Sequence, residues 1–446
     1  MIRPGPAALA FATATLLAGA FVPLARTAPA PGIVTLKNGL RVVLAPDSAA
    51  TAVDLAVWYP VGIGAEGRDA LGVRHLVERL MFRGSAGFGD GEHTKRLVAE
   101  GGSPNTQLQL DYSCFYETLP AEALQLALTL EADRMAGLKT APAAFEEARR
   151  ATIADVRGRA SRPVVTRAIA RLGAAVYDGL AYDRPAEGDE AVLARMSPGA
   201  VEAWRSSHYG TRNAVLTLVG RFDAPATLAL VRRLFERLPA SGPGSVAASR
   251  TAVPAATTHH LWEQGQGLPA RLLMIGWRVP GVNDPDAAAL ELLAAVLAAP
   301  ETGGFTYAMT QRWASASFAQ SGLDRHRDAS MLWTVTALTP AADSAAVELQ
   351  VSDLVEATRR DLVAGTDLER VRARLLGSEM LRAQLVRARA QTIGEGICES
   401  GDLTAAERRI AALQKVTPAD LQRVATRVLS ADVRSVVWQV PAGGGR

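Results

Sequence analysis

Cysteine, lysine and long apolar runs are all scarce in this 446-residue chain. Its two cysteines, Cys114 and Cys398, cannot form a disulfide framework. Because they lie in different halves we expect two buried free thiols, with pairing in an oxidising compartment as the alternative. Lysine occurs only at positions 37, 95, 139 and 415, so the positive charge is almost all arginine, spread along the chain to a net charge of +3. Without a basic block, the sequence gives no support to nucleic-acid binding or to attraction by an anionic membrane.

The first 30 residues have the features of a secretory signal peptide. Arg3 supplies a short positive segment, residues 7–24 are apolar, and the triplets at 18–20 and 28–30 are candidate A-x-A cleavage sites. We therefore predict a signal peptide over residues 1–30 and a secreted or periplasmic location. An uncleaved membrane anchor is the alternative, although a proline interrupts the apolar run. No later stretch is long and apolar enough to span a bilayer, so we expect no stable membrane insertion.

Landmarks repeat along the chain at a nearly constant interval. Trp58 and Trp277 each lie in an apolar stretch typical of a strand, and they are 219 residues apart. Ser197 and Thr417 each precede a proline in the pattern that begins a helix, and they are 220 residues apart. An apolar strand pattern follows each of these two helices. Two pairs of landmarks at one interval predict the internal duplication of an α+β domain.

The repeat divides the chain into two domains of similar length. We predict an N-terminal domain over residues 33–240, a linker over 241–257, a C-terminal domain over 258–441 and a short tail over 442–446. With 48% hydrophobic residues, the chain can bury a core in each domain. No expected strand leads into a glycine-rich phosphate loop, so the sequence does not support nucleotide binding.

The segment HLVER at 75–79 places His75, Glu78 and Arg79 on one face of an expected helix. In the pattern H-x-x-E-H, two histidines hold zinc and the glutamate between them activates the bound water. Here Arg79 replaces the second histidine. The remaining histidines do not stand at a ligand-like spacing with a partner on a shared element; they are His93, His208, His259, His260 and His326.

Four longer sequence runs, taken together with this motif, are specific enough to indicate a protein family. They are FRGS at 82–85, the run from AEGGSPN to EADRM at 99–135, HYGTRNAVLTLVGRFD at 208–223 and GWRVPGVNDPDAAALELL at 276–293. Together they resemble the pitrilysin/insulinase-type (inverzincin) family of zinc metallopeptidases, over roughly residues 33–440. The resemblance implies two homologous α/β-sandwich domains that form one half of a peptidase clamshell, with the peptide site between two such halves.

The resemblance assigns a role to each residue of the motif. His75 matches the first zinc ligand, Glu78 the general base, and Asp155 the third ligand, which is a glutamate in the family. Arg79 stands at the second ligand. A guanidinium stays protonated and offers no lone pair, and its charge repels a metal ion. We therefore expect no bound zinc and no other cofactor, with Arg79 ion-paired to Asp155 or to Glu78.

The resemblance also implies a peptide-binding surface. The family pairs its substrate with an edge strand that begins at an asparagine, here Asn105 of the run at 105–112, and such pairing depends mainly on backbone groups. In the second domain, an arginine and a tyrosine six residues later help to hold the substrate. Arg312 matches the arginine, and Phe318 stands in place of the tyrosine. The alternatives are an ordinary amphipathic strand, a surface arginine and a core phenylalanine.

Three functions are compatible with these patterns. We favour a non-catalytic subunit that completes the peptide-binding chamber of a zinc-bearing paralogue, because some members of the family divide the zinc site and the substrate arginine between two chains. The second is a peptide-binding or scaffold protein without a peptidase partner, and the third is an active zinc metalloendopeptidase with an altered metal site. A neighbouring gene for an intact H-x-x-E-H chain separates the first from the second, and metal content separates the third from both.

Overall fold

The computed structural model describes residues 32–244, 256–265, 267–300 and 303–442. The expected signal peptide and most of the expected linker lie outside the described residues. Within the described part, no helix combines the length and the apolar character that crossing a membrane requires.

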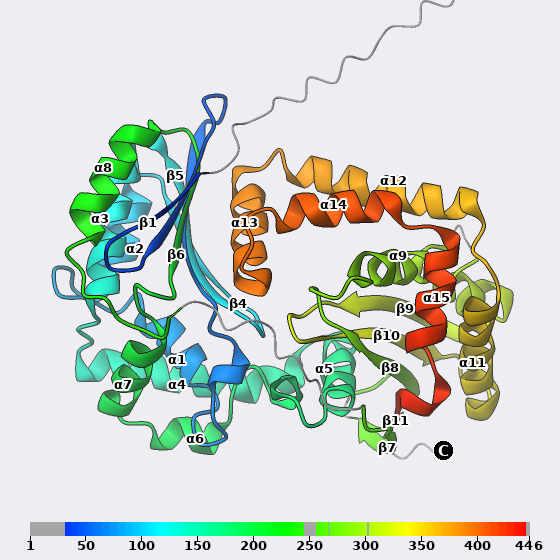
Figure 1. The fold of residues 1–446 in the computed structure, drawn as a ribbon. Coiled ribbons are helices and arrows are strands. Elements are labelled where there is room, and N and C mark those ends of the chain that lie inside the picture. Colours follow the sequence, from blue (N-terminus) through cyan, green and yellow to red (C-terminus); the bar gives the residue numbers. More distant parts are fainter. Residues whose placement is uncertain (1–31, 245–255, 266, 301–302, 443–446) are drawn as a thin grey trace, which may run out of the picture.

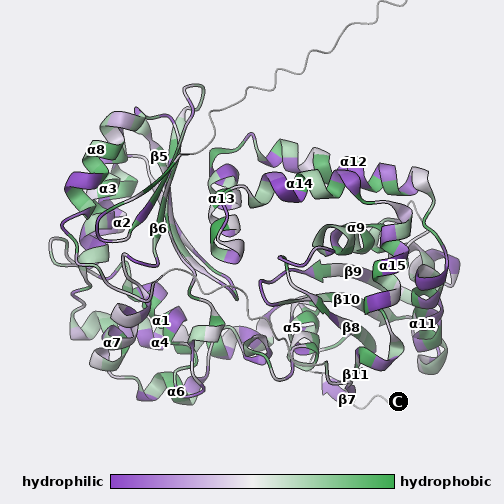
Figure 2. Cartoon of the chain, in the orientation of Figure 1, coloured by the Kyte–Doolittle hydropathy of each residue, from purple (hydrophilic) through white to green (hydrophobic). Residues whose placement is uncertain are grey.

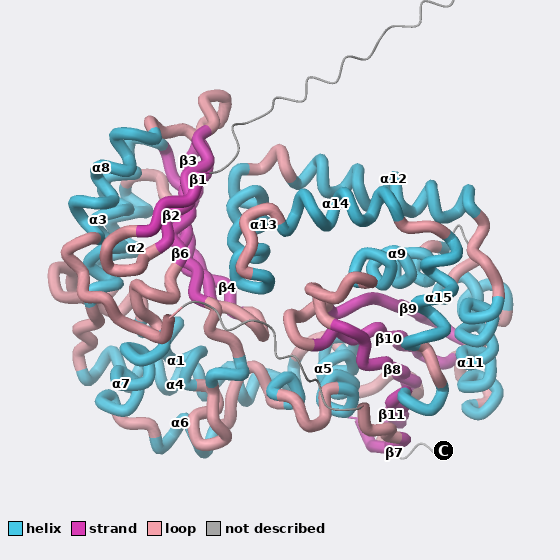
Figure 3. Tube along the Cα trace, viewed as in Figure 1, coloured by secondary structure: helices cyan, strands magenta, loops and turns pink. Residues whose placement is uncertain are grey.

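Two mixed sheets, one in each half, form the centre of the described residues (Figure 1, Figure 3). In spatial order, the first contains β1 (Gly32–Thr35), β2 (Arg41–Pro46), β6 (Val215–Gly220), β3 (Ala52–Tyr59), β5 (Ser113–Pro120) and β4 (Ser103–Leu108). The second contains β7 (His260–Gly265), β11 (Arg434–Pro441), β8 (Leu272–Pro280), β10 (Ala329–Leu338) and β9 (Ala316–Asp324). From β2 onwards the two sheets have the same order, with one parallel pair followed by antiparallel pairs. This repeated topology confirms the predicted duplication.

Helices cover both sheets and follow a similar order in the two halves. The first half contains α1 (Val73–Leu80), α2 (Glu92–Ala99), α3 (Leu124–Ala136), α4 (Pro142–Gly158), α5 (Val164–Val176), α6 (Glu190–Arg195), α7 (Pro198–His208) and α8 (Ala224–Phe235). The second contains α9 (Ala287–Ala298), α10 (Phe305–Tyr307), α11 (Ser344–Arg360), α12 (Gly365–Arg382), α13 (Val386–Ser400), α14 (Ala405–Lys415) and α15 (Pro418–Val428). The predicted caps are present: Ser197 accepts from the backbone N–H of Ala200, and Thr417 from that of Asp420.

Each half lends one helix to the sheet of the other half. Helix α5 packs on β8, β10 and β11 of the second sheet, and α13 packs on β3 and β6 of the first sheet (Figure 1). Buried apolar side chains form the centre of both contacts, and Figure 2 shows hydrophobic residues along the strands that these helices cover. Leu172 of α5 shares a buried cluster with Met274 of β8, and Ile397 of α13 shares another with Trp58 of β3. The two sheets are therefore tied together by exchanged helices as well as by the chain.

Glycines make room for the exchanged helices. A Cβ atom on Gly394 of α13 would lie 2.0 Å from the Trp58 ring, and one on Gly276 of β8 would lie 2.7 Å from Val176 of α5. Both distances are far inside van der Waals contact, so a larger residue at either position would displace a helix.

A buried histidine also joins the two halves. His326 Nδ1 lies 3.6 Å from Asp111 Oδ2, and His326 Nε2 lies 2.9 Å from Asp324 Oδ2. Burial alone would lower the pKa of His326, but the two carboxylates outweigh it and raise that pKa to about 9. The imidazolium is therefore charged at neutral pH and forms an ion pair between the halves.

Two expected elements differ from the structure at their ends. The strand expected at 105–112 ends at Leu108. The helical spacing of apolar residues over 119–138 predicts one long helix, but α3 begins only at Leu124, because Pro120 closes β5 and a short 3-10 turn follows it. Cys114 and Cys398 are both free and buried, in one cluster between β5 and α13.

Candidate functional site

Helix α1 presents His75, Glu78 and Arg79 on its outward face. Its inward face is buried, with Leu76 and Val77 fully enclosed, as the helical spacing of polar and apolar residues requires. The three polar side chains line a cavity of about 440 Å³, and the other walls of the cavity come from α2, β4 and α4. The motif thus faces open space rather than the protein core.

Helix α4 places Asp155 against this group. Asp155 Oδ2 lies 3.3 Å from His75 Nε2 and accepts a hydrogen bond from Arg79 Nη2. Glu78 Oε2 lies 3.8 Å from the same His75 nitrogen. Of the two carboxylates considered as partners for Arg79, the structure therefore pairs it with Asp155.

This donor set does not fit a zinc ion. Three donors with lone pairs are needed; His75 and Asp155 supply two of them, and Arg79 supplies none. The oxygen of Asp155 that faces His75 already accepts a hydrogen bond from Arg79, so the guanidinium takes the place of a cation. The distance of 3.3 Å between His75 Nε2 and Asp155 Oδ2 is nevertheless close to the roughly 3.3–3.6 Å between two ligand atoms of a tetrahedral zinc ion. Asp155 Oδ2 therefore lies at a ligand-like distance from His75 Nε2.

The edge strand β4 forms one wall of the cavity. Thr106 Oγ1 donates a hydrogen bond to Glu78, and the side chain of Asn105 accepts one from the backbone N–H of Thr106 at 2.8 Å. Asn105 is exposed and lines the cavity. Among the described strands, β4 pairs only with β5, so its outer edge presents N–H and C=O groups to an incoming strand.

Arg312 and Phe318 lie in the second half and do not line this cavity. Arg312 ends a π-helical turn, and its guanidinium lies 5.6 Å from the ring centre of Trp313. Phe318, on the edge strand β9, is 39% exposed rather than part of the core. Between them Ala314, with a φ of 50°, is the one non-glycine residue of the described chain in the left-handed region. A π-turn and a strained residue are typical of functional sites, and neither leaves a sequence pattern.

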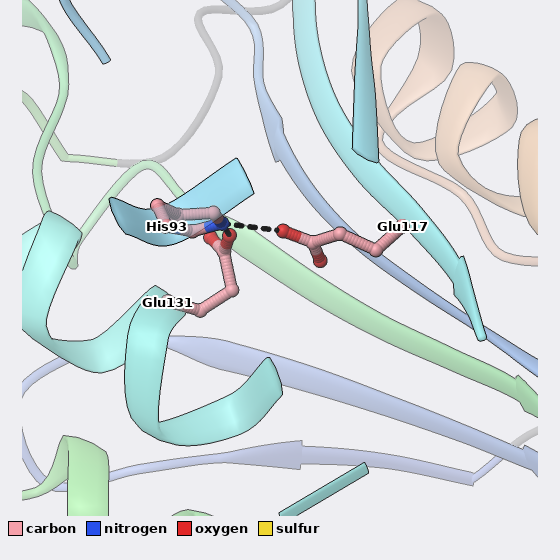
Figure 4. A group of neighbouring side chains, drawn as sticks. All are labelled: His93, Glu117 and Glu131. Carbon is pink, nitrogen blue, oxygen red and sulfur yellow. Dashed lines mark hydrogen bonds and ion pairs between the residues drawn. The ribbon is translucent and has the colours of Figure 1, made fainter. Parts of the chain in front are cut away.

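A second histidine–carboxylate group lies buried beside the motif helix. Figure 4 shows His93 of α2 pointing toward Glu117 of β5 and Glu131 of α3. His93 Nε2 lies 3.0 Å from Glu117 Oε1 and 3.5 Å from Glu131 Oε1, close enough for the three side chains to share a metal ion. Sequence patterns miss this group because its members come from three separate elements.

An arginine already supplies the cation of this second group. Arg134 donates a hydrogen bond to Glu131 Oε1, the same oxygen that faces His93. Its guanidinium also lies 5.0 Å from the Phe82 ring and 4.9 Å from the Phe115 ring. Burial raises the pKa of Glu131 to about 8 despite Arg134, and burial lowers the pKa of His93 to about 4. At neutral pH the group is thus compensated by Arg134 and a proton, and its polar contacts join α2, β5 and α3.

A duplicated α/β fold, with a histidine and a glutamate on one helix facing a carboxylate on another, defines the class of the inverted-motif zinc peptidases and their relatives. The chain belongs to peptidase family M16. The family model for insulinase (peptidase family M16) matches residues 41–189, and the one described as the peptidase M16 inactive domain matches residues 195–375.

Known proteins with similar sequence or fold include zinc proteases and peptidase subunits. An uncharacterized zinc protease of Mycobacterium tuberculosis is 23% identical over 401 residues, covering 90% of this chain and 91% of the relative. A probable mitochondrial-processing peptidase subunit beta of Arabidopsis thaliana is 23% identical over 421 residues, covering 90% of this chain and 77% of the relative. The crystal structure of a protease from Helicobacter pylori matches with a TM-score of 0.82 at 19% identity, covering 93% of this chain and 100% of that one. The structural match establishes the fold, one half of an M16 clamshell.

Proposed function

We propose that this chain is a non-catalytic subunit that completes the peptide-binding chamber of a zinc-bearing M16 paralogue. The observation that carries the proposal is the ion pair between Arg79 and Asp155. It leaves two usable donors beside a fixed positive charge, so this chain has no means to hold the metal that would activate a water molecule. The zinc must then come from another chain.

Two features give the chain a role beside such a partner. The outer edge of β4 offers backbone groups to a peptide, and the second half presents the exposed side chains of Arg312 and Phe318. Neither feature depends on zinc. Similarity to a protein named as a subunit of mitochondrial-processing peptidase supports assembly with a paralogue.

We also propose that the complex works outside the cytoplasm. The support is the signal-peptide pattern of residues 1–30, with its positive start, apolar run and small-residue cleavage sites. N-terminal sequencing of the protein from periplasmic and culture fractions tests this proposal. A mature protein that still begins at Met1 in the cytoplasm would contradict it.

Mixing the purified chain with the H-x-x-E-H paralogue of the same genome tests the subunit role. We expect the paralogue alone to have low activity on a peptide substrate, the two chains to elute together, and the mixture to be more active. Arg312→Ala should reduce the gain, whereas Arg233→Ala, which removes an exposed arginine from α8, should not. Separate elution and an unchanged rate would show that the subunit assignment is wrong.

A further inference from the structure

A second cavity, of about 660 Å³, lies between the two halves, and β4 separates it from the His75 cavity. Its walls come from the end of β4, the turn before β10, and helices α9, α12, α13 and α14. The neighbouring β4 residues Thr106 and Gln107 line different cavities. Thr106 donates to Glu78 on one side, while on the other Gln107 Nε2 donates to Tyr112 Oη at 3.3 Å, and Tyr112 Oη donates to Glu395 Oε1 at 2.8 Å.

Most charged groups in the wall of this inter-domain cavity are ion-paired. The pairs are Arg409 with Glu291 and Glu379, Arg325 with Glu291, Arg382 with Glu379, Arg408 with Asp402, Asp284 with Arg427, and Asp111 with His326. Glu395 and Glu399 differ from these. Among the described residues that line the cavity, they are the two carboxylates without an ion-paired cation.

Their place on α13 makes this lack of a cation unfavourable. The helix ends at Ser400 with no basic residue in its last turn, so Glu399 lies at the end of the helix that carries partial negative charge. The two carboxylates are also four residues apart, a spacing at which like charges repel. Tyr112 and Gln391 satisfy hydrogen bonds of Glu395 but bring no charge. Burial, and then Glu395, raise the pKa of Glu399 to about 7, although the charges of Arg325 and His326 act in the opposite direction.

We propose that the inter-domain cavity receives the lysine or arginine side chain of a peptide that pairs with β4. A peptide added to β4 alternates its side chains as β4 does, so one residue faces the His75 cavity and the next faces Glu395 and Glu399. The incoming cation forms the direct ion pair that these two carboxylates lack. The inference rests on the proposed peptide-binding function and adds a substrate class to it, extended peptides with a basic residue at the position facing α13.

The probe is a fluorescein-labelled nine-residue peptide of alternating threonine and alanine with a central lysine, compared with the same peptide carrying norleucine. Anisotropy titrations of the purified chain at about pH 8 and low salt give both dissociation constants. We expect the lysine peptide to bind at least about tenfold more tightly, since a charge-assisted hydrogen bond is worth roughly 1.5–3 kcal/mol. Glu395→Gln with Glu399→Gln should remove this preference and leave binding of the norleucine peptide unchanged.

The matched control is Glu407→Gln, which removes an exposed carboxylate from the neighbouring helix α14 and should keep the preference. Because glutamine has nearly the shape of glutamate, both variants should melt within a few degrees of the wild type. If both peptides bind equally to the wild type, or if the double variant keeps the lysine preference, the cation site is wrong while peptide binding stands. If neither peptide binds, the proposed peptide-binding function fails as well.

Discussion

Replacing Arg79 by histidine should turn the His75 cavity into a zinc site. Histidines at positions 75 and 79 lie one helical turn apart and face the same side. Asp155 Oδ2 is already 3.3 Å from His75 Nε2, so a third donor would complete a set with suitable spacing. Adding Asp155→Glu should change the affinity by less than about tenfold, because the shorter side chain already reaches the site.

The repulsion that this substitution removes is large. A zinc ion bound at roughly 2 Å to Asp155 would lie about 4 Å from the guanidinium that hydrogen-bonds to the same oxygen. Charges of +2 and +1 at that distance repel each other by about 8 kcal/mol at an effective dielectric constant of about 20, roughly a million-fold in dissociation constant. Arg79 is 36% exposed and its side chain can turn toward solvent, so this figure is an upper bound.

Arg79→Gln separates charge from coordination, because glutamine removes the cation and adds no ligand that zinc favours. Competition with a fluorescent chelator should give the weakest zinc binding for the wild type, intermediate binding for Arg79→Gln and the tightest for Arg79→His. His75→Ala should reduce Arg79→His to the level of Arg79→Gln. The reasoning is refuted if the wild type holds one equivalent of zinc that His75→Ala removes, or if the histidine and glutamine variants bind zinc equally.

Two further predictions concern the joining of the halves. Gly394→Ala should destabilise the chain by roughly 2–3 kcal/mol, because its methyl group would overlap the Trp58 ring. Gly377→Ala is the control: a Cβ there meets nothing within 4 Å, so this change should stabilise the chain by about 0.5–1 kcal/mol. Urea denaturation compares the two, and equal effects would show that α13 does not need this close contact. His326 has a folded pKa of about 9 against about 6.5 unfolded, so its ion pair with Asp111 contributes fully below pH 6.5 and is lost as the pH rises through 9. Between pH 6.5 and pH 9 the free energy of unfolding of the wild type should fall by an amount on the order of 3 kcal/mol, and that of His326→Gln should fall by less. Identical pH profiles for the wild type and His326→Gln would contradict this prediction.

The duplicated fold can be predicted from the sequence because strands and helix caps leave local patterns. Trp58 and Trp277 lie in the matching strands β3 and β8, although Trp58 faces the exchanged helix α13 and Trp277 faces the core of its own half. Ser197 and Thr417 cap the matching helices α7 and α15. The exchange of α5 and α13 cannot be predicted in this way. Amphipathic spacing shows that a helix buries one face, but it does not show which sheet covers that face.

The candidate site also contains some residues that local sequence patterns predict and others that depend on tertiary packing. His75, Glu78 and Arg79 share a helix face by spacing alone, and family resemblance supplies Asp155 from a distant helix. How closely Asp155 approaches His75 depends on how α1 and α4 pack, which no local sequence pattern records. The group around His93 depends on tertiary packing throughout, because its members share no element.

The most direct test of the subunit proposal is to find which chain's glutamate the peptidase reaction needs. The rate of the complex is measured with Glu78→Gln in this chain, and separately with glutamine in the H-x-x-E-H motif of the paralogue. Glu78→Gln keeps an oxygen that can accept from Thr106, so the wall formed by β4 is preserved. A general base contributes roughly 10²–10⁴ to the rate, so the account predicts a loss of that size from the paralogue's variant and less than about a twofold change from Glu78→Gln. If Glu78→Gln abolishes the activity while the paralogue's variant retains it, this chain carries out the chemistry and its assignment as a non-catalytic subunit is wrong.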